Sequence, residues 1–405
     1  MSLDEDLEEA AAGSAPGVPG LRRARAWLSR AVEPGTTDFW RYVEDVGPVE
    51  AVRRLRSGRA PVRIRSLVGA RAEQDATLAD LTRAERCDAR LVIPEDDEWP
   101  ALPLHALTVA VGAEPADSTR QSDRMKAPVP PLALWVRGAQ RLDELVDRSV
   151  AIVGSRASTA YGEHVAGELA HQLGERAWTV VSGGAFGIDA AAHRGALAAD
   201  APTVAVLACG VDRPYPAAHG ALFHRIAETG LLVSEWPPGC APLRHRFLVR
   251  NRLIAALTRG TVVVEAAARS GAQATAQRAH RMGRQVLVVP GPVTSAMSVG
   301  CHELLRDEEV GATLVASADH VIEAVGGIGT DLADPPERPT GPRDGLSDLA
   351  ARVLDACPVR SGVSPERLAA IAGCDVLEVL RVLPALELAD LVEWTGTGWR
   401  LRPTA

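Results

Sequence analysis

From Ser149 onward, short apolar runs alternate with runs whose apolar positions have helical spacing. The apolar runs are predicted strands at 150–153, 179–182, 203–207, 231–234, 261–265 and 285–289. Predicted helices follow them at 162–173, 189–197, 219–228, 251–257, 272–281 and 303–306. Near-continuous apolar strands separated by helices are typical of a mainly parallel sheet covered on both faces. The pattern therefore predicts a doubly wound α/β fold, whose ligands bind at the carboxyl ends of the strands.

The segments before this repeat have other patterns. Residues 1–20 are acidic and rich in Ala and Gly, which predicts a disordered tail, and 21–87 show the arginine-rich periodicity of a small helical module. The sheet domain is expected over 88–326, with a short strand at 132–136. Within it, the polar, Pro-containing stretch 113–131 predicts a flexible insertion.

The chain after the sheet domain is predicted to form a linker and a separate unit. Residues 327–345 are rich in Pro, Gly and Asp, as linkers are. Over 346–405 the pattern is helix, helix, helix and hairpin, which is the winged-helix order. The predicted third helix carries Glu378 and Glu387 against Arg381 alone. An acidic recognition helix suits phosphates poorly, so a docking or regulatory role is favoured over DNA reading, with its partner unknown.

The local distribution of charge leads to a different expectation about nucleic acid than the net charge does. The formal net charge is −8, which argues mildly against nucleic acid, yet residues 236–302 contain nine arginines and one acid, Glu265. Such a local field matters more to a polyanion than the global sum. The six cysteines form no CxxC pair, so neither a zinc site nor a disulfide framework is indicated. No signal peptide or membrane span is recognisable, and we expect a cytoplasmic protein.

Glycines and polar residues follow several predicted strands, and the carboxyl ends of parallel strands meet at one edge. Gly154-Ser155-Arg156 follows the first strand, and Ser182-Gly183-Gly184 closes the second. Glycines let a ligand approach the backbone, and helix N-termini present N–H groups to anions. The turn GSRASTAYG is neither GxGxxG nor a P-loop, and Lys126 is the only lysine. We therefore expect a phosphate site without NAD(P), ATP or another cofactor.

The stretch 236–252, which reads WPPGCAPLRHRFLVRNR, contains no acidic residue. It is predicted to be a loop beside a strand end, in which arginines at 244, 246, 250 and 252 surround the ring of Phe247. A phosphate backbone with unstacked bases needs such guanidinium groups and a stacking ring. A solvated basic loop is the alternative interpretation of the stretch taken alone.

These residues resemble a known family, DNA-processing protein A, also called Smf. The resemblance runs in order over roughly residues 90–325 and is carried by many motifs. They are VAIVGSRASTAYG at 150–162, VVSGGAFGIDAAAHRGAL at 180–197, YP at 215–216, SEWPPG at 234–239, RFLVRNRLIAAL at 246–257, VVVEAAARSGAQATAQRA at 262–279 and VPGPV at 289–293. The resemblance implies an extended Rossmann-like fold, single-stranded DNA binding, a homodimer and no established catalysis. It also implies loading of the RecA recombinase in natural transformation.

Carried over position by position, the resemblance assigns roles to the residues already singled out. Arg156 would hold a phosphate, Arg244 would contact the strand and Phe247 would stack a base. The turn after the second strand would offer a hydroxyl and backbone N–H groups. The candidate DNA-binding residues are Gly154, Ser155, Arg156, Ser182, Gly183, Gly184, Arg244, Arg246, Phe247, Arg250 and Asn251.

Two other classes of function are weighed against this one. A nucleoside-monophosphate phosphoribohydrolase would carry PGGxGTxxE, but here the turn reads RSGAQATAQ, without the double glycine or the glutamate. Asp189 and His193 share a helix face, where a structural pair is favoured over a catalytic dyad. A pure protein-interaction adaptor, with an incidental basic loop, is the third class. Salt dependence distinguishes such an adaptor from a DNA-binding protein, because binding through phosphates weakens steeply with ionic strength.

Overall fold

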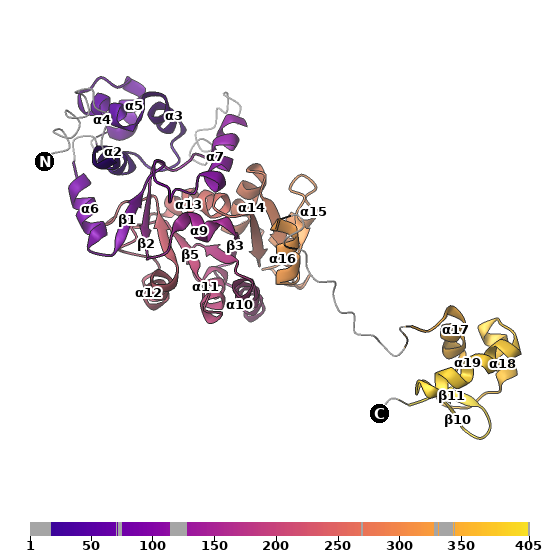
Figure 1. Cartoon of the computed structure of the whole chain (residues 1–405). Helices are drawn as coiled ribbons and strands as arrows, with labels where there is room; N and C mark the ends of the chain where they lie inside the picture. Colours follow the sequence, from indigo (N-terminus) through magenta and orange to yellow (C-terminus); the bar gives the residue numbers. More distant parts are fainter. Residues whose placement is uncertain are drawn as a thin grey trace. The chain divides into compact units, whose positions relative to one another are not determined.

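The structure is a computed structural model that describes residues 18–403 except 70, 72–74, 114–127, 269, 328–330, 332–342 and 344. The chain divides into two compact units, Met1–Ala333 and Asp334–Ala405, and Figure 1 shows the elements of each. Most of the predicted tail, insertion and linker lies outside the described residues. Helix α2 already begins at Val18 and Val129 is buried, so the predicted tail and insertion do not extend over all the residues expected. The other domain boundaries stay predictions.

One mixed sheet organises the first unit. Over the described residues its strand order is β1-β2-β6-β5-β4-β3-β7-β8-β9. From β6 to β9 neighbouring strands are parallel, whereas β2 runs antiparallel to both β6 and β1. The strands are β1 (Ala89–Val92), β2 (Leu134–Arg137), β3 (Ser149–Gly154), β4 (Thr179–Ser182), β5 (Thr203–Leu207), β6 (Leu231–Ser234), β7 (Gly260–Val264), β8 (Gln285–Val288) and β9 (Thr313–Leu314).

Helices cover both faces of the sheet, as the apolar strands require. In β3, Ala151 and Val153 belong to one apolar cluster, whereas Val150 and Ile152 belong to another. The first cluster is shared with α7 (Ala101–Ala113), α9 (Leu142–Asp147), α13 (Arg244–Ala256), α14 (Gly271–Arg281) and α15 (Val299–Arg306). The helices of the opposite face are α10 (Ala160–Glu175), α11 (Ile188–Ala198), α12 (Gly220–Thr229) and α16 (Ala318–Val325). The predicted doubly wound α/β fold is confirmed.

The strand register brings the functional turns to one edge. Gly154 pairs with Val264, and Ser182 pairs with Ala205. Because these strands are parallel, their carboxyl ends meet at the same edge of the sheet. The first βα turn and the basic stretch therefore approach each other although they are far apart in the sequence.

The N-terminal module consists of short helices around their own apolar core. Its helices are α2 (Val18–Ala31), α3 (Thr37–Val46), α4 (Pro48–Arg56), α5 (Val62–Val68) and α6 (Thr77–Glu85). Trp27, Phe39 and Val52 lie in the core that α2 to α5 share. Gly47 and Pro48 separate α3 from α4, since Gly47 has a φ of 81° and Pro48 opens the next helix. Within the described residues, no helix is both long and apolar enough to span a membrane.

The second unit has its own core around Val353, Leu368 and Leu383. Its elements are α17 (Asp348–Ala356), α18 (Pro365–Ala372), α19 (Val376–Leu388), β10 (Val392–Trp394) and β11 (Trp399–Leu401). A capping box of Asp375 and Glu378 opens α19. The order of elements is the one expected, and its assignment to the winged-helix class stays a prediction.

Candidate nucleic-acid interface

A groove with a volume of about 920 Å³ lies along the carboxyl edge of the sheet. Turns after β3, β4, β5 and β7 contribute to its lining, together with the first half of α13. This is where ligands of doubly wound sheets bind. The candidate residues that line the groove are Gly154, Ser155, Arg156, Arg244, Phe247, Arg250 and Asn251.

Glu265 fixes the conformation of the first βα turn. Its main-chain carbonyl accepts the N–H of Ser155 at 2.8 Å, and its carboxylate accepts the N–H of Thr159 at 2.8 Å and the hydroxyl of the same residue. Gly154 must be glycine, because a Cβ there would lie 1.9 Å from the carbonyl oxygen of Val264. These contacts hold the backbone of the turn while the side chain of Arg156 remains exposed. The turn thus presents one fixed positive charge to the groove.

Arg156 meets the aromatic ring that the sequence singled out. Its guanidinium carbon lies 5.1 Å from the centre of the Phe247 ring, and that of Arg250 lies 6.0 Å from it. The ring of Tyr215 approaches Phe247 edge-on, with 5.9 Å between the ring centres. Phe247 is half-buried, whereas Tyr215 and Arg156 are exposed. A cation beside aromatic faces at one groove is the combination that single-stranded nucleic acid requires.

From Arg244 onward the basic stretch is helical, which corrects the predicted loop there, whereas residues 236–243 precede the helix. Helix α13 begins at Arg244, and its buried face carries Arg246, Arg250 and Arg252. Arg250 donates to the carbonyl of Gly183 at 2.8 Å and to that of Val206, and burial lowers its pKa to about 10. Two of the four guanidinium groups of the stretch, those of Arg246 and Arg252, bind carboxylates of the same chain instead.

Arg246 and Arg252 hold structural ion pairs. Arg246 donates to the Glu33 carboxylate at 2.6 Å and 3.1 Å, and joins α13 to the segment after α2. Arg252 donates to both oxygens of Glu235, at 2.6 Å and 2.8 Å, in a pair that is almost fully buried. Burial raises the pKa of Glu235, although Arg252 opposes the change. The predicted DNA contact of Arg246 therefore does not fit its geometry, and Arg244 remains the exposed arginine of this helix.

The turn after β4 also differs from its predicted role. Ser182 is fully buried and its hydroxyl donates to the carbonyl of Ile152 at 2.6 Å. The carbonyl of Gly184 lies 3.1 Å from Nδ1 of His219. The Asp189 carboxylate accepts the N–H of Ala185 at 3.3 Å, so a negative group of the protein itself occupies the place in this turn where a phosphate was expected. Neither Ser182, Gly183 nor Gly184 lines the groove, and the expected phosphate cradle is already satisfied.

The residues considered for catalysis are engaged in the fold. Nδ1 of His193 lies 2.8 Å from Oγ1 of Thr203, which donates to the carbonyl of Val180, so His193 pairs with Thr203 rather than with Asp189. Burial lowers the pKa of His193 to about 3 and raises that of Asp189. Glu235 is held by Arg252 and Glu265 by Thr159. No cluster of three or more His, Cys, Asp or Glu that suits a metal occurs among the described residues.

Some residues of the groove were not among the candidates. Tyr215, Leu248, Ser270 and Met297 line it, and Met297 lies beside the Ser155 hydroxyl at 3.5 Å. The YP pair was noted in the sequence without a role. Its place directly after the third apolar run was a signal that could have located Tyr215, because that run ends at the same sheet edge.

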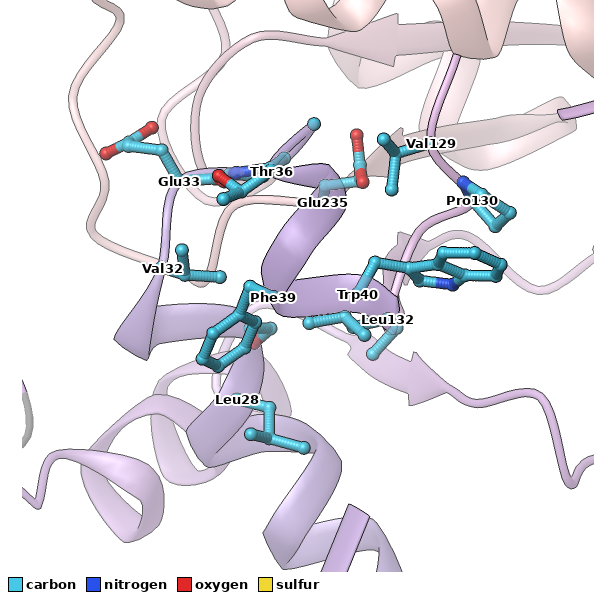
Figure 2. Close-up of a pocket in the computed structure, with 14 residues that line it drawn as sticks. Leu28, Val32, Glu33, Thr36, Phe39, Trp40, Val129, Pro130, Leu132 and Glu235 are labelled. Atoms are coloured by element: carbon cyan, nitrogen blue, oxygen red, sulfur yellow. The ribbon is translucent and has the colours of Figure 1, made fainter. Parts of the chain in front are cut away.

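A second cavity lies between the N-terminal helices and the sheet domain, and it is too small for a nucleotide. Figure 2 shows Leu28, Phe39 and Trp40 of the helices opposite Leu132 and Glu235. Its volume is about 20 Å³, which is room for about one water molecule.

Comparisons with known proteins agree with this geometry. The sequence pattern of the family described as DNA recombination-mediator protein A matches residues 91–326. A DNA processing protein DprA of Mycobacterium tuberculosis is 48% identical over 380 residues, covering 94% of this chain and 94% of that protein. Protein Smf of Escherichia coli is 36% identical over 309 residues, covering 75% of this chain and 79% of that protein. The X-ray structure of DNA processing protein A from Streptococcus pneumoniae matches with a TM-score of 0.59 and 28% identity, over 75% of this chain and 96% of that chain.

The fold and the groove define a Rossmann-like α/β protein with an arginine and aromatic rings at the carboxyl edge of its sheet. The chain belongs to the DNA recombination-mediator protein A family, whose members include the DNA processing proteins DprA and Smf. The resemblance drawn from the sequence motifs is thereby confirmed.

Proposed function

We propose that this protein binds single-stranded DNA in the groove at the carboxyl edge of its sheet, without catalysing a reaction on it. One observation carries the proposal: Arg156 lies 5.1 Å from the ring centre of Phe247 in an open groove. A phosphate would bind Arg156, the strand would pass Arg244, and a base would stack against Phe247 and Tyr215. Stacking needs unpaired bases and accepts any of them, so single strands are preferred and sequence specificity is low.

Few charges are available to the DNA phosphates within this groove. Arg156 and Arg244 are exposed on its lining, whereas Arg250 is committed to main-chain carbonyls. Each single-strand phosphate neutralised contributes about 0.7 to the slope of log affinity against log salt. Two phosphates per protomer give a slope of about −1.4, which is shallower than the basic stretch suggests when all its arginines are counted. A homodimer would raise the affinity through avidity along one strand.

The biological role follows from the family to which the chain belongs. We place the protein in DNA processing during natural transformation and homologous recombination, where it would protect single strands and load RecA recombinase in the cytoplasm. RecA loading is tested by the rate at which RecA assembles on single strands that are already coated by a single-strand-binding protein. The proposed role requires that the full chain accelerates this assembly and that Arg156→Ala does not.

Fluorescence anisotropy tests DNA binding directly. Labelled oligothymidine and a duplex of equal length are titrated with the full chain at about 50 and 200 mM salt, the range over which phosphate contacts show their salt dependence. We expect the single strand to bind more tightly than the duplex and to weaken with salt. Equal binding of both forms, or affinity that salt does not change, would favour the adaptor interpretation and reject the proposal.

A further inference from the structure

The Phe and Tyr side chains of this chain are distributed unevenly between its core and its surface. There are seven of them, and Phe39, Tyr42 and Phe223 are buried. The others are at least partly accessible, and all of them lie in the segments that follow strands at the carboxyl edge of the sheet. They are Tyr161 after β3, Phe186 after β4, Tyr215 after β5 and Phe247 at the start of α13 after β6.

Three of these rings follow adjacent strands. The sheet order places β6, β5 and β4 side by side, so the segments that carry Phe247, Tyr215 and Phe186 leave neighbouring strands at one edge of the sheet. The ring centres of Phe247 and Tyr215 are 5.9 Å apart. Tyr161 is directed elsewhere, since its hydroxyl donates to the carbonyl of Pro290 beyond β8.

Phe186 and Tyr215 are exposed where burial would be the ordinary state of an aromatic ring. Each has 48% of its surface accessible, although the fold offers an apolar core directly beneath the turns. Phe186 is held by an edge contact with His219, at 4.6 Å between ring centres, which fixes one side of the ring. It directly follows Ala185, which lines the groove. Phe186 therefore directly adjoins the groove lining in the chain, although its own ring is not part of that lining.

Positive charge accompanies the rings. Arg156 lies over Phe247, and the exposed Arg213 lies two residues before Tyr215, with no ion-pair partner among the described residues. The β4–α11 turn packs on the first βα turn, since the N–H of Ile188 donates to the carbonyl of Ser155 at 3.2 Å. A strand that crosses this edge of the sheet would thus find aromatic rings together with guanidinium groups, as single-strand sites commonly have.

We propose that Phe247, Tyr215 and Phe186 form an aromatic row on which successive bases of one DNA strand stack, so that the strand crosses the sheet edge from α13 to α11. This inference rests on the proposed binding of single-stranded DNA and adds its path and direction across the fold. Tyr215 and Phe186 are base-stacking residues of this path. The row makes the footprint longer than the Arg156–Phe247 pair alone, because it adds the rings of Tyr215 and Phe186.

The test compares oligothymidines of about 4 and 12 nucleotides, a range taken from the site sizes of single-strand proteins. Variants of the full chain are Phe247→Ala, Tyr215→Leu and Phe186→Leu, in which leucine keeps apolar bulk and removes the aromatic face. We expect Phe186→Leu to weaken the longer strand by about fivefold or more and to leave the shorter strand unchanged, since stacking contributes about 1–3 kcal/mol per base. Tyr215→Phe and Phe186→Trp keep a ring and should retain the affinity.

Photocrosslinking gives an independent measurement. An oligothymidine with one 5-iodouracil at successive positions is irradiated with wild-type protein, and crosslinked peptides are mapped. The row predicts crosslinks to Phe247, Tyr215 and Phe186 in the order of the iodouracil positions. Circular dichroism and urea midpoints equal to wild type establish that each variant is folded.

The outcomes separate the two proposals. If wild type binds no single strand, the proposed function fails and the row with it. If wild type binds and Phe247→Ala weakens it, while Tyr215→Leu and Phe186→Leu bind both lengths like wild type and no crosslink reaches Phe186, DNA binding stands and the aromatic row is wrong.

Discussion

The guanidinium group of Arg156 lies over the ring of Phe247, with 5.1 Å between the guanidinium carbon and the ring centre. Arg156 lies in the turn after β3, whereas Phe247 lies in the first turn of α13, which follows β6. An exposed cation–π contact contributes about 0.5–1 kcal/mol, so it orients the two side chains without locking them. Each therefore remains available to a different part of a nucleotide, the cation to the phosphate and the ring to the base.

Arg156→Ala should weaken single-strand binding equally for all base sequences. The side chain contacts a phosphate in the proposed complex, and phosphate contacts carry no sequence information. We expect the slope of log affinity against log salt to become shallower by about 0.7 to 1. Anisotropy titrations at several salt concentrations, on homopolymers of two bases, measure both effects.

Arg225→Ala is the matched control for this loss of charge. Arg225 is exposed on α12, away from the groove lining, and its nearest acid is Glu228 at 3.8 Å. Its removal changes the net charge by the same amount and should leave the salt slope at the wild-type value. A similar loss of affinity in both variants would show that net charge, rather than the groove, sets the binding.

Phe247→Ala should cost about 1–3 kcal/mol of binding free energy to single strands. The ring is half-buried between Arg156 and Tyr215, so removing it leaves both side chains without their shared contact. Phe247→Trp supplies a larger face and should retain most of the affinity. Titrations with single-stranded and duplex oligonucleotides measure the effect, and an equal loss on both would contradict stacking as its cause.

The strands could be predicted from the sequence because their side chains are buried on both faces of the sheet. The runs at 179–182, 203–207 and 231–234 coincide with β4, β5 and β6. A strand buried on both faces contains few polar residues, so its length is visible directly. The placement of Arg156 and Phe247 at one edge follows from the same reasoning, because both come after such strands.

The internal roles of the arginines could not be read in the same way. Arg246 and Arg250 occupy the buried face of α13 together with Leu253, Ile254 and Leu257, at helical spacing. The sequence does not distinguish a buried arginine from an exposed one. The partners of these two arginines, Glu33 for Arg246 and Gly183 for Arg250, are also distant in the sequence. The amphipathic pattern was therefore hidden, and the first turns of the helix were interpreted as a loop.

Arg250→Met should destabilise the fold rather than only weaken binding. Arg250 is buried, and its removal leaves the carbonyls of Gly183 and Val206 without their donor and the Asp189 carboxyl without the stronger of the two positive charges that act on it. Breaking a buried charged network by removing one partner costs about 3–5 kcal/mol. Urea unfolding followed by circular dichroism measures this cost. A variant as stable as wild type that has lost DNA binding would instead return Arg250 to the binding surface.

Glu33→Gln should reduce stability at neutral pH and flatten the acid dependence of unfolding. Burial raises the pKa of Glu33, but hydrogen bonds from Arg246 and Trp236 and the charges of Arg246 and Arg71 outweigh it and lower the pKa overall. A carboxyl whose pKa is lowered in the folded state stabilises the fold fully above its ordinary value of about 4.3, and this contribution is lost as the pH falls through the folded pKa. The neutral amide removes a charge-assisted pair of about 1–3 kcal/mol, so the variant should lack this stability fully above about 4.3, and its deficit should shrink as the pH falls through the folded pKa. Urea midpoints from neutral pH to below 4.3 measure the difference, with Glu309→Gln, an exposed carboxyl, as control. If Glu33→Gln and Glu309→Gln gave the same midpoints at every pH, the Glu33–Arg246 pair would not hold the N-terminal module against α13.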